Sequence, residues 1–350
     1  MTTPLIISFQ QIEELTSLSS FDTLLIDAIE KGFASFSYGK FNGCPIQTMG
    51  APPMAPMECS STAKSIRIDE HDTYAAQVCV KSGYMTGESH FVIKVAAGGA
   101  PWKHSGSMQV YSQETGQLQA LLLDQGLLTE LRTAAAGAVA TKHLGPKQIT
   151  QIGLLGTGVQ ARYQLQYHQH ITDCRQVMIY GRTTAKVKLL QQDLQEQGWH
   201  VTIAAIPNDL MTTCNLIITT TSARVPLLTD AIPLTQQQTL LICIGADAPG
   251  KQELSTALVA SADCLVCDCQ WQTQERGEFQ HALHDGIIHR NSILELGTII
   301  DDSSPIPTPR ILTIFDSSGV AFQDCIVATI IYELFVNQAS KSRNNLDLTV

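Results

Sequence analysis

The pattern of hydrophobic and polar residues changes near residue 149 of this 350-residue chain. From there on, short apolar runs alternate with longer stretches of helical periodicity. The apolar runs are residues 149–156, 176–180, 200–206, 215–221, 239–245 and 263–268. Runs that are apolar on both faces are typical of strands in a parallel sheet, and their alternation with helices indicates βαβ units. We therefore predict an α/β fold in which residues 131–312 form a doubly wound parallel sheet of the Rossmann type.

Residues 1–130 have a different pattern, which includes a helical stretch at residues 21–39. Four strand-like segments follow, at residues 73–84, 89–99, 107–113 and 116–123. Strands that follow one another without intervening helices favour an antiparallel sheet, so we expect a smaller α+β domain here.

Two further helices complete the predicted organisation. One begins with Thr129 as its N-cap and leads into the Rossmann domain. The other, an apolar helix at residues 320–338, is expected to pack on the α+β domain. The α+β domain is therefore predicted to comprise residues 1–130 and 313–350.

Composition and charge narrow the class of protein. The chain is 44% hydrophobic and 15% charged, which favours a large buried core over disorder. Its 22 basic and 32 acidic residues give a formal net charge of -10, which repels nucleic acids and anionic lipids. The N-terminal residues lack the pattern of a signal peptide, and no apolar run reaches the ~18 residues of a membrane span. We expect a cytoplasmic protein with neither nucleic acid nor a membrane as its partner.

The ten cysteines show no even spacing that would indicate a disulfide framework. Cys264, Cys267 and Cys269 form the tightest group and could supply three metal ligands. The segment has the pattern of a buried strand, however, and no second CxxC or HxxxH accompanies it. We therefore predict no metal site.

A glycine-rich turn follows the first predicted strand of the Rossmann domain. Gly156-Thr157-Gly158-Val159-Gln160-Ala161 has the form GxGxxA and opens a helix. Gly156 allows a tight turn, Gly158 lets a pyrophosphate approach the backbone, and the small Ala161 permits close packing of helix on strand. We predict that Gly156, Gly158, Val159 and Gln160 bind a dinucleotide.

The end of the second predicted strand indicates which dinucleotide is bound. An Asp or Glu at this position would hold the ribose 2′-hydroxyl of NAD, but the chain has Gly181-Arg182-Thr183. Arg182 can grip a 2′-phosphate, and Thr183 can donate a further hydrogen bond. NADP(H) is therefore favoured, and NAD(H) stays possible. Thr221, at the end of a later strand, is predicted to belong to the same site.

Three further polar residues are candidates for the chemistry. Lys94 lies in an otherwise apolar strand, where a buried ammonium would need a partner or a lowered pKa; the alternative is a side chain that points to water. Arg132 lies in the first turn of the predicted connecting helix, where anions are favoured, unless it forms a surface ion pair with Glu130. Asp247 follows a strand at the ligand-binding edge of the sheet, unless it only shapes the turn before Pro249.

Several segments together resemble the ornithine cyclodeaminase and mu-crystallin family, in matching order and spacing from about residue 80 to the C-terminus. They are FVIKVAAGG, LLLDQGLLTELRTAAAGAVATKHL, IGLLGTGVQARYQ, ICIGADAPGKQEL and TIFDSSGVAFQD. The resemblance implies hydride exchange at the α-carbon of an amino or imino acid, and a homodimer that pairs through the α+β domain and the last helix. It also implies that Lys94 is the active-site lysine, that Arg132 binds the substrate carboxylate and that Asp247 binds the amine. Residues Asp316–Asp324 are expected to fold against the nicotinamide.

One departure from the family pattern affects the substrate pocket. Many members carry a second carboxylate-binding arginine just after a proline near residue 46, whereas this chain has Cys44-Pro45-Ile46-Gln47. Gln47, Lys40 or Arg67 could substitute, or the substrate is held differently. The insertion-like stretch at residues 51–72 lies near the same place.

The resemblance leaves three activities to be separated. The absence of an acid at residues 181–183 favours NADPH, and hence a reductase of cyclic ketimine carboxylates such as pyrroline- or piperideine-2-carboxylate. The first alternative is a lyase that borrows a hydride internally, acting on ornithine or a hydroxyproline. The second is a non-catalytic NADP(H)-dependent binder of the mu-crystallin type. The reductase and the lyase differ in whether NADPH is consumed.

Overall fold

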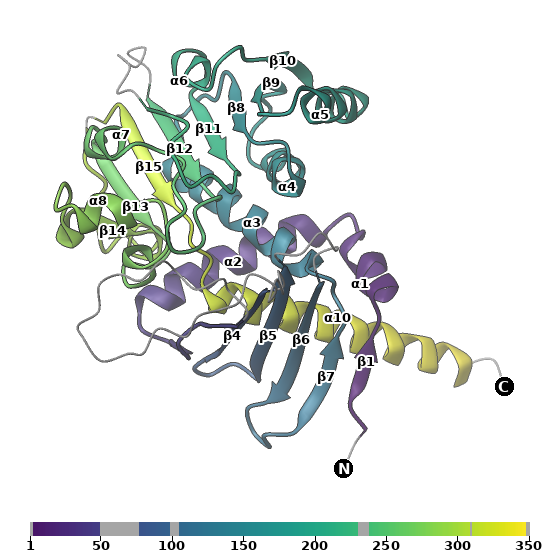
Figure 1. Cartoon of the computed structure of the whole chain (residues 1–350). Helices are drawn as coiled ribbons and strands as arrows, with labels where there is room; N and C mark the ends of the chain where they lie inside the picture. Colours follow the sequence, from purple (N-terminus) through teal and green to yellow (C-terminus); the bar gives the residue numbers. More distant parts are fainter. Residues whose placement is uncertain (1–2, 50–76, 99–104, 230–237, 309, 348–350) are drawn as a thin grey trace, which may run out of the picture. The chain divides into compact units, whose positions relative to one another are not determined.

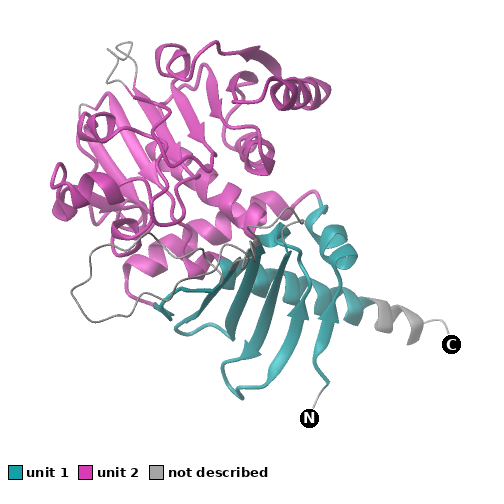
Figure 2. Cartoon of the chain, in the orientation of Figure 1, with its two compact units in different colours: residues 1–18, 41–128, 324–350 teal, residues 19–40, 129–323 magenta. Residues whose placement is uncertain are grey.

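The computed structural model describes residues 3–49, 77–98, 105–229, 238–308 and 310–347 (Figure 1). The chain forms two compact units, each assembled from separate segments (Figure 2). Unit 1 comprises residues 1–18, 41–128 and 324–350, and unit 2 comprises residues 19–40 and 129–323. Within the described part of the chain, no helix has the length and apolar character needed to cross a bilayer.

Unit 1 is built on a seven-stranded sheet with the order β1-β7-β6-β5-β4-β2, in which β3 also pairs with β4. The strands are β1 (Leu5–Ile7), β2 (Phe41–Gly43), β3 (Gln47–Met49), β4 (Gln77–Met85), β5 (His90–Gly98), β6 (Ser105–Ser112) and β7 (Leu118–Leu122). Its helices are α1 (Phe9–Thr16) and, from Asp324 onward, α10 (Ala321–Asp347). The pairs from β4 to β7 are antiparallel, which confirms the predicted α+β sheet.

One face of this sheet is covered by α10. The Cys325 thiol lies 3.3 Å from the carbonyl oxygen of Gly83 in β4, and the rings of Tyr332 and His90 are 5.1 Å apart. These contacts confirm that the last helix packs on the α+β part of the chain. The short elements β1 and α1 were not predicted, because three and eight residues give too little periodicity. Ser8 caps α1 through a reciprocal capping box with Gln11.

Unit 2 contains an eight-stranded parallel sheet with the order β10-β9-β8-β11-β12-β15-β13-β14. Its strands are β8 (Ile152–Leu155), β9 (Gln176–Tyr180), β10 (His200–Ile203), β11 (Leu216–Thr219), β12 (Thr239–Cys243), β13 (Cys264–Cys267), β14 (Ile293–Glu295) and β15 (Leu312–Asp316). Every residue of β8, β11, β12, β13 and β15 is buried, as expected for strands with apolar side chains on both faces. The doubly wound Rossmann-type sheet is thus confirmed, and Cys264 and Cys267 lie in the buried strand predicted for them.

The helices of unit 2 include the connections between these strands. They are α2 (Phe21–Ser37), α3 (Leu127–Leu144), α4 (Val159–His168), α5 (Thr184–Glu196), α6 (Asp209–Thr213), α7 (Thr256–Ala260), α8 (Gln280–His284) and α9 (Leu296–Ile300), with 3-10 turns at Gln272–Gln274 and Arg290–Ser292. Helix α3 begins three residues earlier than a Thr129 N-cap predicts, and a side-chain oxygen of Asp124 accepts from Leu128 N at 3.2 Å. Thr129 is therefore inside the helix, and Arg132 lies in its second turn rather than its first.

The division into units differs from the predicted domains at two places. Residues 19–40 group with the Rossmann sheet, because α2 packs against α9. Strand β15 lies between β12 and β13, although the predicted boundary at residue 312 left it outside the sheet. Residues 312–316 form one short apolar run, and no further βα unit follows it. The sequence pattern therefore does not indicate that this segment returns to the centre of the sheet.

The packing of α9 on α2 makes a testable prediction. A Cβ atom at Gly297 would lie 2.2 Å from the carbonyl oxygen of Phe33, and a backbone oxygen inside a helix cannot move aside. We expect Gly297→Ala to lower the free energy of unfolding by about 1–3 kcal/mol, as overpacking does, although alanine favours helices. Urea denaturation measures the change; an unaltered or higher midpoint would contradict the packing.

Candidate functional site

A pocket of about 460 Å³ lies at the carboxyl edge of the unit 2 sheet, where β8, β9 and β11 end. It is lined by Leu155, Gly156, Thr157, Gly158, Tyr180, Gly181, Arg182, Thr183, Lys186, Thr220, Thr221, Ser222, Ala223 and Leu227. Five predicted residues, Gly156, Gly158, Arg182, Thr183 and Thr221, therefore line one pocket. This edge is where open α/β sheets bind their ligands.

The glycine-rich turn has the conformation that a pyrophosphate requires. Gly156 has a φ of 123°, and a Cβ atom there would lie 2.5 Å from the Thr220 hydroxyl. Gly158 is the N-cap of α4, and the position of a Cβ atom on it has nothing within 4 Å. The first turn of α4 carries no acidic residue, so its N–H groups favour an anion. The open space beside Gly158 fits a dinucleotide phosphate.

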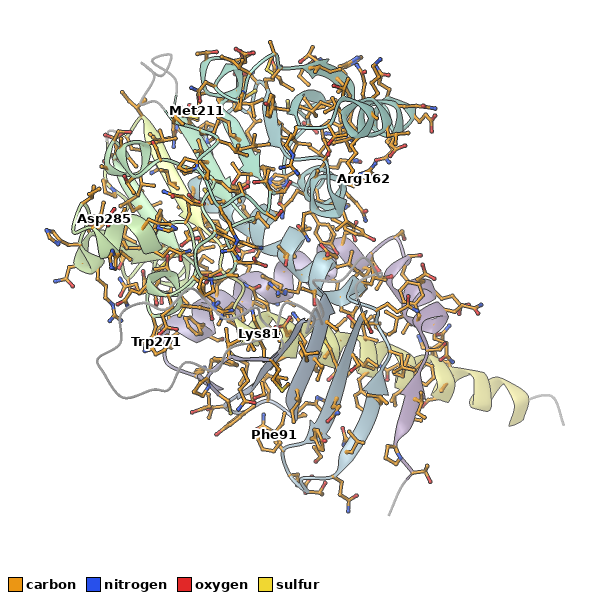
Figure 3. All side chains as sticks on the ribbon, viewed as in Figure 1. Lys81, Phe91, Arg162, Met211, Trp271 and Asp285 are labelled. Carbon is orange, nitrogen blue, oxygen red and sulfur yellow. The ribbon has the colours of Figure 1, made fainter. Side chains whose placement is uncertain are left out.

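Arg162, which is labelled in Figure 3, contacts two carbonyl oxygens of this turn. Its Nη1 lies 3.4 Å from the carbonyl oxygens of Thr157 and Gly158. The same guanidinium pairs with Asp193 on α5. The turn is therefore tied to the neighbouring helix α5.

Val159 and Gln160 were predicted to bind the dinucleotide but do not line the pocket. Val159 is 45% exposed. The Gln160 amide donates to the carbonyl oxygen of Glu130 at 3.0 Å and also to the Glu130 carboxylate. Any contribution of these two residues would come from their backbone N–H groups, and this stays a prediction.

The end of β9 presents cations to the pocket. Arg182 and Thr183 line it as predicted, together with Lys186 in the first turn of α5, which sequence reasoning missed. The spacing of Arg182 and Lys186, four residues apart at a predicted helix start, could have found it. No acidic residue is among those that line the pocket, and within the described residues neither cation has an ion pair.

Thr221 lines the pocket, as the predicted membership of the dinucleotide site requires, and its polar groups have partners inside the protein. Its hydroxyl donates to a Glu253 oxygen at 2.7 Å and lies 3.3 Å from the N–H of Ala223, which donates to it. Its backbone N–H donates to the same Glu253 oxygen at 2.6 Å. Because these bonds use the polar groups of Thr221, the residue lines the pocket while it is held from inside the protein.

Four buried carboxyl groups lie behind this edge of the sheet. Glu278 accepts from the backbone N–H groups of Glu253 and Leu254, and Asp316 accepts from Glu278 N at 2.9 Å. Asp268 accepts from the Ser318 hydroxyl and from Gly319 N, both at 2.7 Å. The carboxyl groups therefore satisfy backbone N–H groups of the loops that follow the strands.

Burial changes the ionisation of these groups. It raises the pKa of Glu253 and of Glu278, whose carboxyl groups lie close together. It raises the pKa of Asp316 to about 8, and the nearby Asp268 carboxylate adds to the shift. Asp316 and Asp324 are both buried, and none of residues 316–324 lines the pocket, so the expected packing of this segment against a nicotinamide stays a prediction.

Asp247 lies in the loop after β12, at the same edge of the sheet as the pocket. Its side chain is 57% exposed and pairs with Lys251 four residues later. The carboxylate is thus available at the surface of unit 2, in the position that the sequence predicted.

Arg132 is buried rather than part of a surface pair with Glu130. It is 4% exposed, and its Nη1 donates to the side-chain oxygen of Gln323 at 2.8 Å. Gln323 is fully buried, and its amide nitrogen has no hydrogen-bond acceptor among the described residues. A buried guanidinium beside an unsatisfied amide donor is suited to binding a carboxylate.

Lys94 is a buried cation of unit 1. Its side chain is 5% exposed and its ammonium lies 3.2 Å from the Asp324 carboxylate on α10. Val92 on the same face of β5 is also buried, so the alternative of a lysine pointing to water is excluded. Lys81 stands directly opposite on β4 and is buried too, a second cation that the sequence analysis did not single out.

Two of the three proposed substitutes for an arginine near residue 46, Gln47 and Lys40, are not buried. Gln47 in β3 and Lys40 before β2 are both exposed within the chain. Arg67 and the stretch at residues 51–72 lie outside the described residues.

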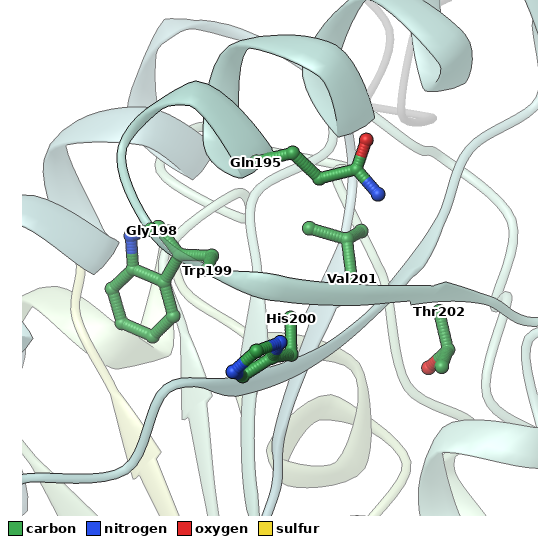
Figure 4. A pocket seen from close by; sticks show the side chains of 6 residues that line it. All are labelled: Gln195, Gly198, Trp199, His200, Val201 and Thr202. Carbon is green, nitrogen blue, oxygen red and sulfur yellow. The ribbon is translucent and has the colours of Figure 1, made fainter.

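A second hollow, of about 440 Å³, lies at the opposite, amino edge of the unit 2 sheet (Figure 4). It is lined by Gln195, Gly198, Trp199, His200, Val201 and Thr202. Arg175 lies over the Trp199 ring, 5.2 Å from its centre. Nothing here resembles the phosphate-binding features of the first pocket.

The comparisons with known proteins identify the family and the fold of the chain. The model of the ornithine cyclodeaminase/mu-crystallin family matches residues 93–339. An uncharacterized cyclodeaminase, y4tK, of Sinorhizobium fredii is 35% identical over 281 residues, which cover 77% of this chain and 83% of that protein. A Δ1-pyrroline-2-carboxylate reductase of Bacillus cereus is 30% identical over 243 residues, covering 68% of this chain and 74% of the reductase.

The iminosuccinate reductase of Paracoccus denitrificans is similar in both sequence and structure. It is 32% identical over 232 residues, which cover 66% of this chain and 71% of the reductase. Its crystal structure in complex with NAD+ superposes with a TM-score of 0.80 and 26% identity, covering 96% of this chain and 97% of that one. The present chain therefore has the same Rossmann-type fold as the iminosuccinate reductase.

The raised pKa of Asp316 predicts a pH-dependent effect on stability. Since its folded-state pKa of about 8 exceeds the ordinary value of 3.8 for an aspartate, the folded state binds an extra proton between these values. The contribution of Asp316 to stability therefore falls as pH rises from about 4 to 8, by at most about 1.4 kcal/mol per pH unit. Asp316→Asn mimics the protonated acid and should gain stability over the unaltered protein as pH rises, levelling above pH 8. Thermal melts from pH 5 to 9 measure this; a constant difference would refute it.

Proposed function

Because this chain belongs to the ornithine cyclodeaminase/mu-crystallin family, we propose that it is an NADPH-dependent reductase of cyclic ketimine carboxylates, of the pyrroline- or piperideine-2-carboxylate type. The observation that carries the proposal is the pair of cations, Arg182 and Lys186, in a dinucleotide-sized pocket without an acidic residue. A reductase takes its hydride from a pool of reduced dinucleotide. The 2′-phosphate distinguishes NADPH from NADH, and the two cations can bind that phosphate. Two of the similar proteins are named as reductases of C=N compounds.

The residues of unit 2 are assigned to binding. Gly156 and Gly158 leave room for the pyrophosphate, and Arg182, Thr183 and Lys186 bind the 2′-phosphate. When bound, NADPH supplies a hydride to the carbon of the substrate C=N bond. The buried guanidinium of Arg132 holds the substrate carboxylate.

Two residues are assigned to the proton and to the amine. Lys94, held by Asp324, stabilises the imine side of the substrate or donates the proton that its nitrogen needs. Asp247, whose carboxylate is exposed beside Lys251, orients the resulting amine or a water molecule. Nitrogen protonation and hydride addition together convert the C=N bond to an amine.

A hydride-borrowing lyase is the second candidate. Its support is the 35% identity to the Sinorhizobium fredii protein that is named a cyclodeaminase. Such an enzyme would oxidise ornithine or a hydroxyproline, eliminate ammonia or water, and return the hydride to the same dinucleotide. It would consume no NADPH.

We also propose that the protein is a homodimer that pairs through unit 1 and α10. The side chains of Phe91, Ile93 and Val95 on β5 alternate with the buried Val92 and Lys94 and are only half-buried. This leaves an apolar sheet face that a second copy can cover.

The cofactor assignment predicts a selective loss of affinity. Arg182→Ala and Lys186→Ala should each weaken NADPH binding about tenfold or more, because each removes a charge-assisted bond to the 2′-phosphate. NADH binding should change less than threefold. Lys188→Ala is the matched control, since Lys188 is exposed on the same helix but does not line the pocket. Fluorescence titration of the unaltered protein and the three variants measures the Kd for each dinucleotide. Equal losses of affinity for NADPH and NADH would argue against a 2′-phosphate site.

The reaction assignment is tested by turnover. The purified protein should oxidise NADPH steadily with pyrroline- or piperideine-2-carboxylate, and Lys94→Ala and Arg132→Ala should lower kcat/KM at least 100-fold. Ornithine and the hydroxyprolines with catalytic NAD(P)+ are assayed in parallel. Product from these without net dinucleotide consumption would replace the reductase with the lyase. Dinucleotide binding without any turnover, unaffected by Lys94→Ala, would indicate a non-catalytic binder.

A further inference from the structure

The Glu253 side chain reaches two loops at the carboxyl edge of the unit 2 sheet. It is fully buried and lies between β12 and α7. One of its carboxyl oxygens accepts from the N–H and the hydroxyl of Thr221, at 2.6 and 2.7 Å. The other accepts from the Thr219 hydroxyl at 2.6 Å and from Gly245 N at 2.9 Å. Both oxygens thus carry two donors each, which fills their lone-pair sites.

The proposed function uses both loops, because one lines the pocket and the other carries Asp247. Residues 220–223, after β11, line the pocket. Gly245 is two residues before Asp247 in the loop after β12. Strands β11 and β12 are neighbours in register, Thr219 opposite Cys243, so their loops leave the sheet side by side. Glu253 bridges the pocket wall and the loop that carries Asp247.

The close approach of these loops depends on glycine at position 245. A Cβ atom there would lie 2.0 Å from the carbonyl oxygen of Thr221 and 2.6 Å from the Glu253 carboxyl group. Backbone bonds reinforce the same arrangement: Gln252 N donates to Ala223 O at 2.9 Å, and Leu227 N to Glu253 O at 2.8 Å. Ala223 and Leu227 both line the pocket.

We propose that Glu253 is a positioning residue for dinucleotide binding, which acts through Thr221 and Gly245 without touching the ligand. The inference rests on the proposed dinucleotide-dependent function. In this arrangement Thr221 shapes the pocket wall because Glu253 holds it on the protein side, and the ligand meets a loop whose conformation is already fixed. Preorganisation of this kind lowers the cost of binding.

Glu253→Gln tests the proposal, because glutamine offers one acceptor oxygen where two are used. If that oxygen faces Thr221, the amide NH2 faces the N–H of Gly245, and the reverse orientation faces the N–H of Thr221. Either way a buried backbone donor loses its acceptor. We expect the Kd for NADPH and for NADH to rise by the same factor, about tenfold, which corresponds to about 1.4 kcal/mol. Equal loss for both dinucleotides separates this effect from that of Arg182 and Lys186.

A second pair of variants tests the route through Thr221. Thr221→Ser keeps the hydroxyl and should bind both dinucleotides nearly as the unaltered protein does. Thr221→Val keeps the shape, loses the hydroxyl, and should weaken both. If serine weakened binding as much as valine, the route through this hydroxyl would be wrong.

Asp263→Ala is the control for general destabilisation. The Asp263 carboxylate accepts from Ile311 N and Leu312 N, at 2.7 and 2.9 Å, at the amino edge of the same sheet. Its loss should lower the melting temperature and leave both Kd values unchanged when titrated well below the melt. Unchanged binding by Glu253→Gln, or equal weakening by Asp263→Ala, would overturn the positioning role. Failure of the unaltered protein to bind either dinucleotide would instead overturn the proposed function.

Discussion

The loops that follow the strands of a buried parallel sheet carry backbone N–H groups that need acceptors. In unit 2, buried carboxyl groups at the carboxyl edge of the sheet accept from them. Strands buried on both faces bring these groups into the interior, where an unsatisfied donor costs about 1–3 kcal/mol. Glu253, Glu278, Asp316 and Asp268 each accept one or more of them. Glu253 holds the loop at residues 220–223 that lines the pocket, and the other three acids hold the loops beside it, so the geometry of the edge depends on this constraint.

The same acids would be unfavourable beside an anionic ligand if all were ionised. Burial raises the pKa of Asp316 to about 8, which reduces the negative charge at this edge of the sheet near neutral pH. The cations Arg182 and Lys186, by contrast, are exposed at its rim. A chain with a formal charge of -10 can thus present a locally favourable surface to phosphates.

Periodicity was sufficient to predict both sheets, because long apolar runs and the GxGxxA turn are local signals. It failed where the decisive contacts are distant in sequence. Strand β15 is inserted between β12 and β13, and α2 joins unit 2 through α9, some 260 residues later. Glu253 looked like part of a motif, and nothing in the sequence indicates that its carboxyl group meets Thr221. The proposed roles of Lys94, Arg132 and Asp247 come from the family resemblance, and the structure adds to them the burial of Lys94 and Arg132 and the partners of all three.

The exposed position of Arg182 and Lys186 has an evolutionary consequence. Neither side chain belongs to the buried carboxyl network, and neither has an ion pair within the described part of the chain. Surface residues of this kind can be exchanged with little effect on folding, within about 0.5 kcal/mol. The preference for one dinucleotide over the other is therefore a feature that a lineage can gain or lose by a few mutations, while the interior that shapes the pocket is inherited unchanged.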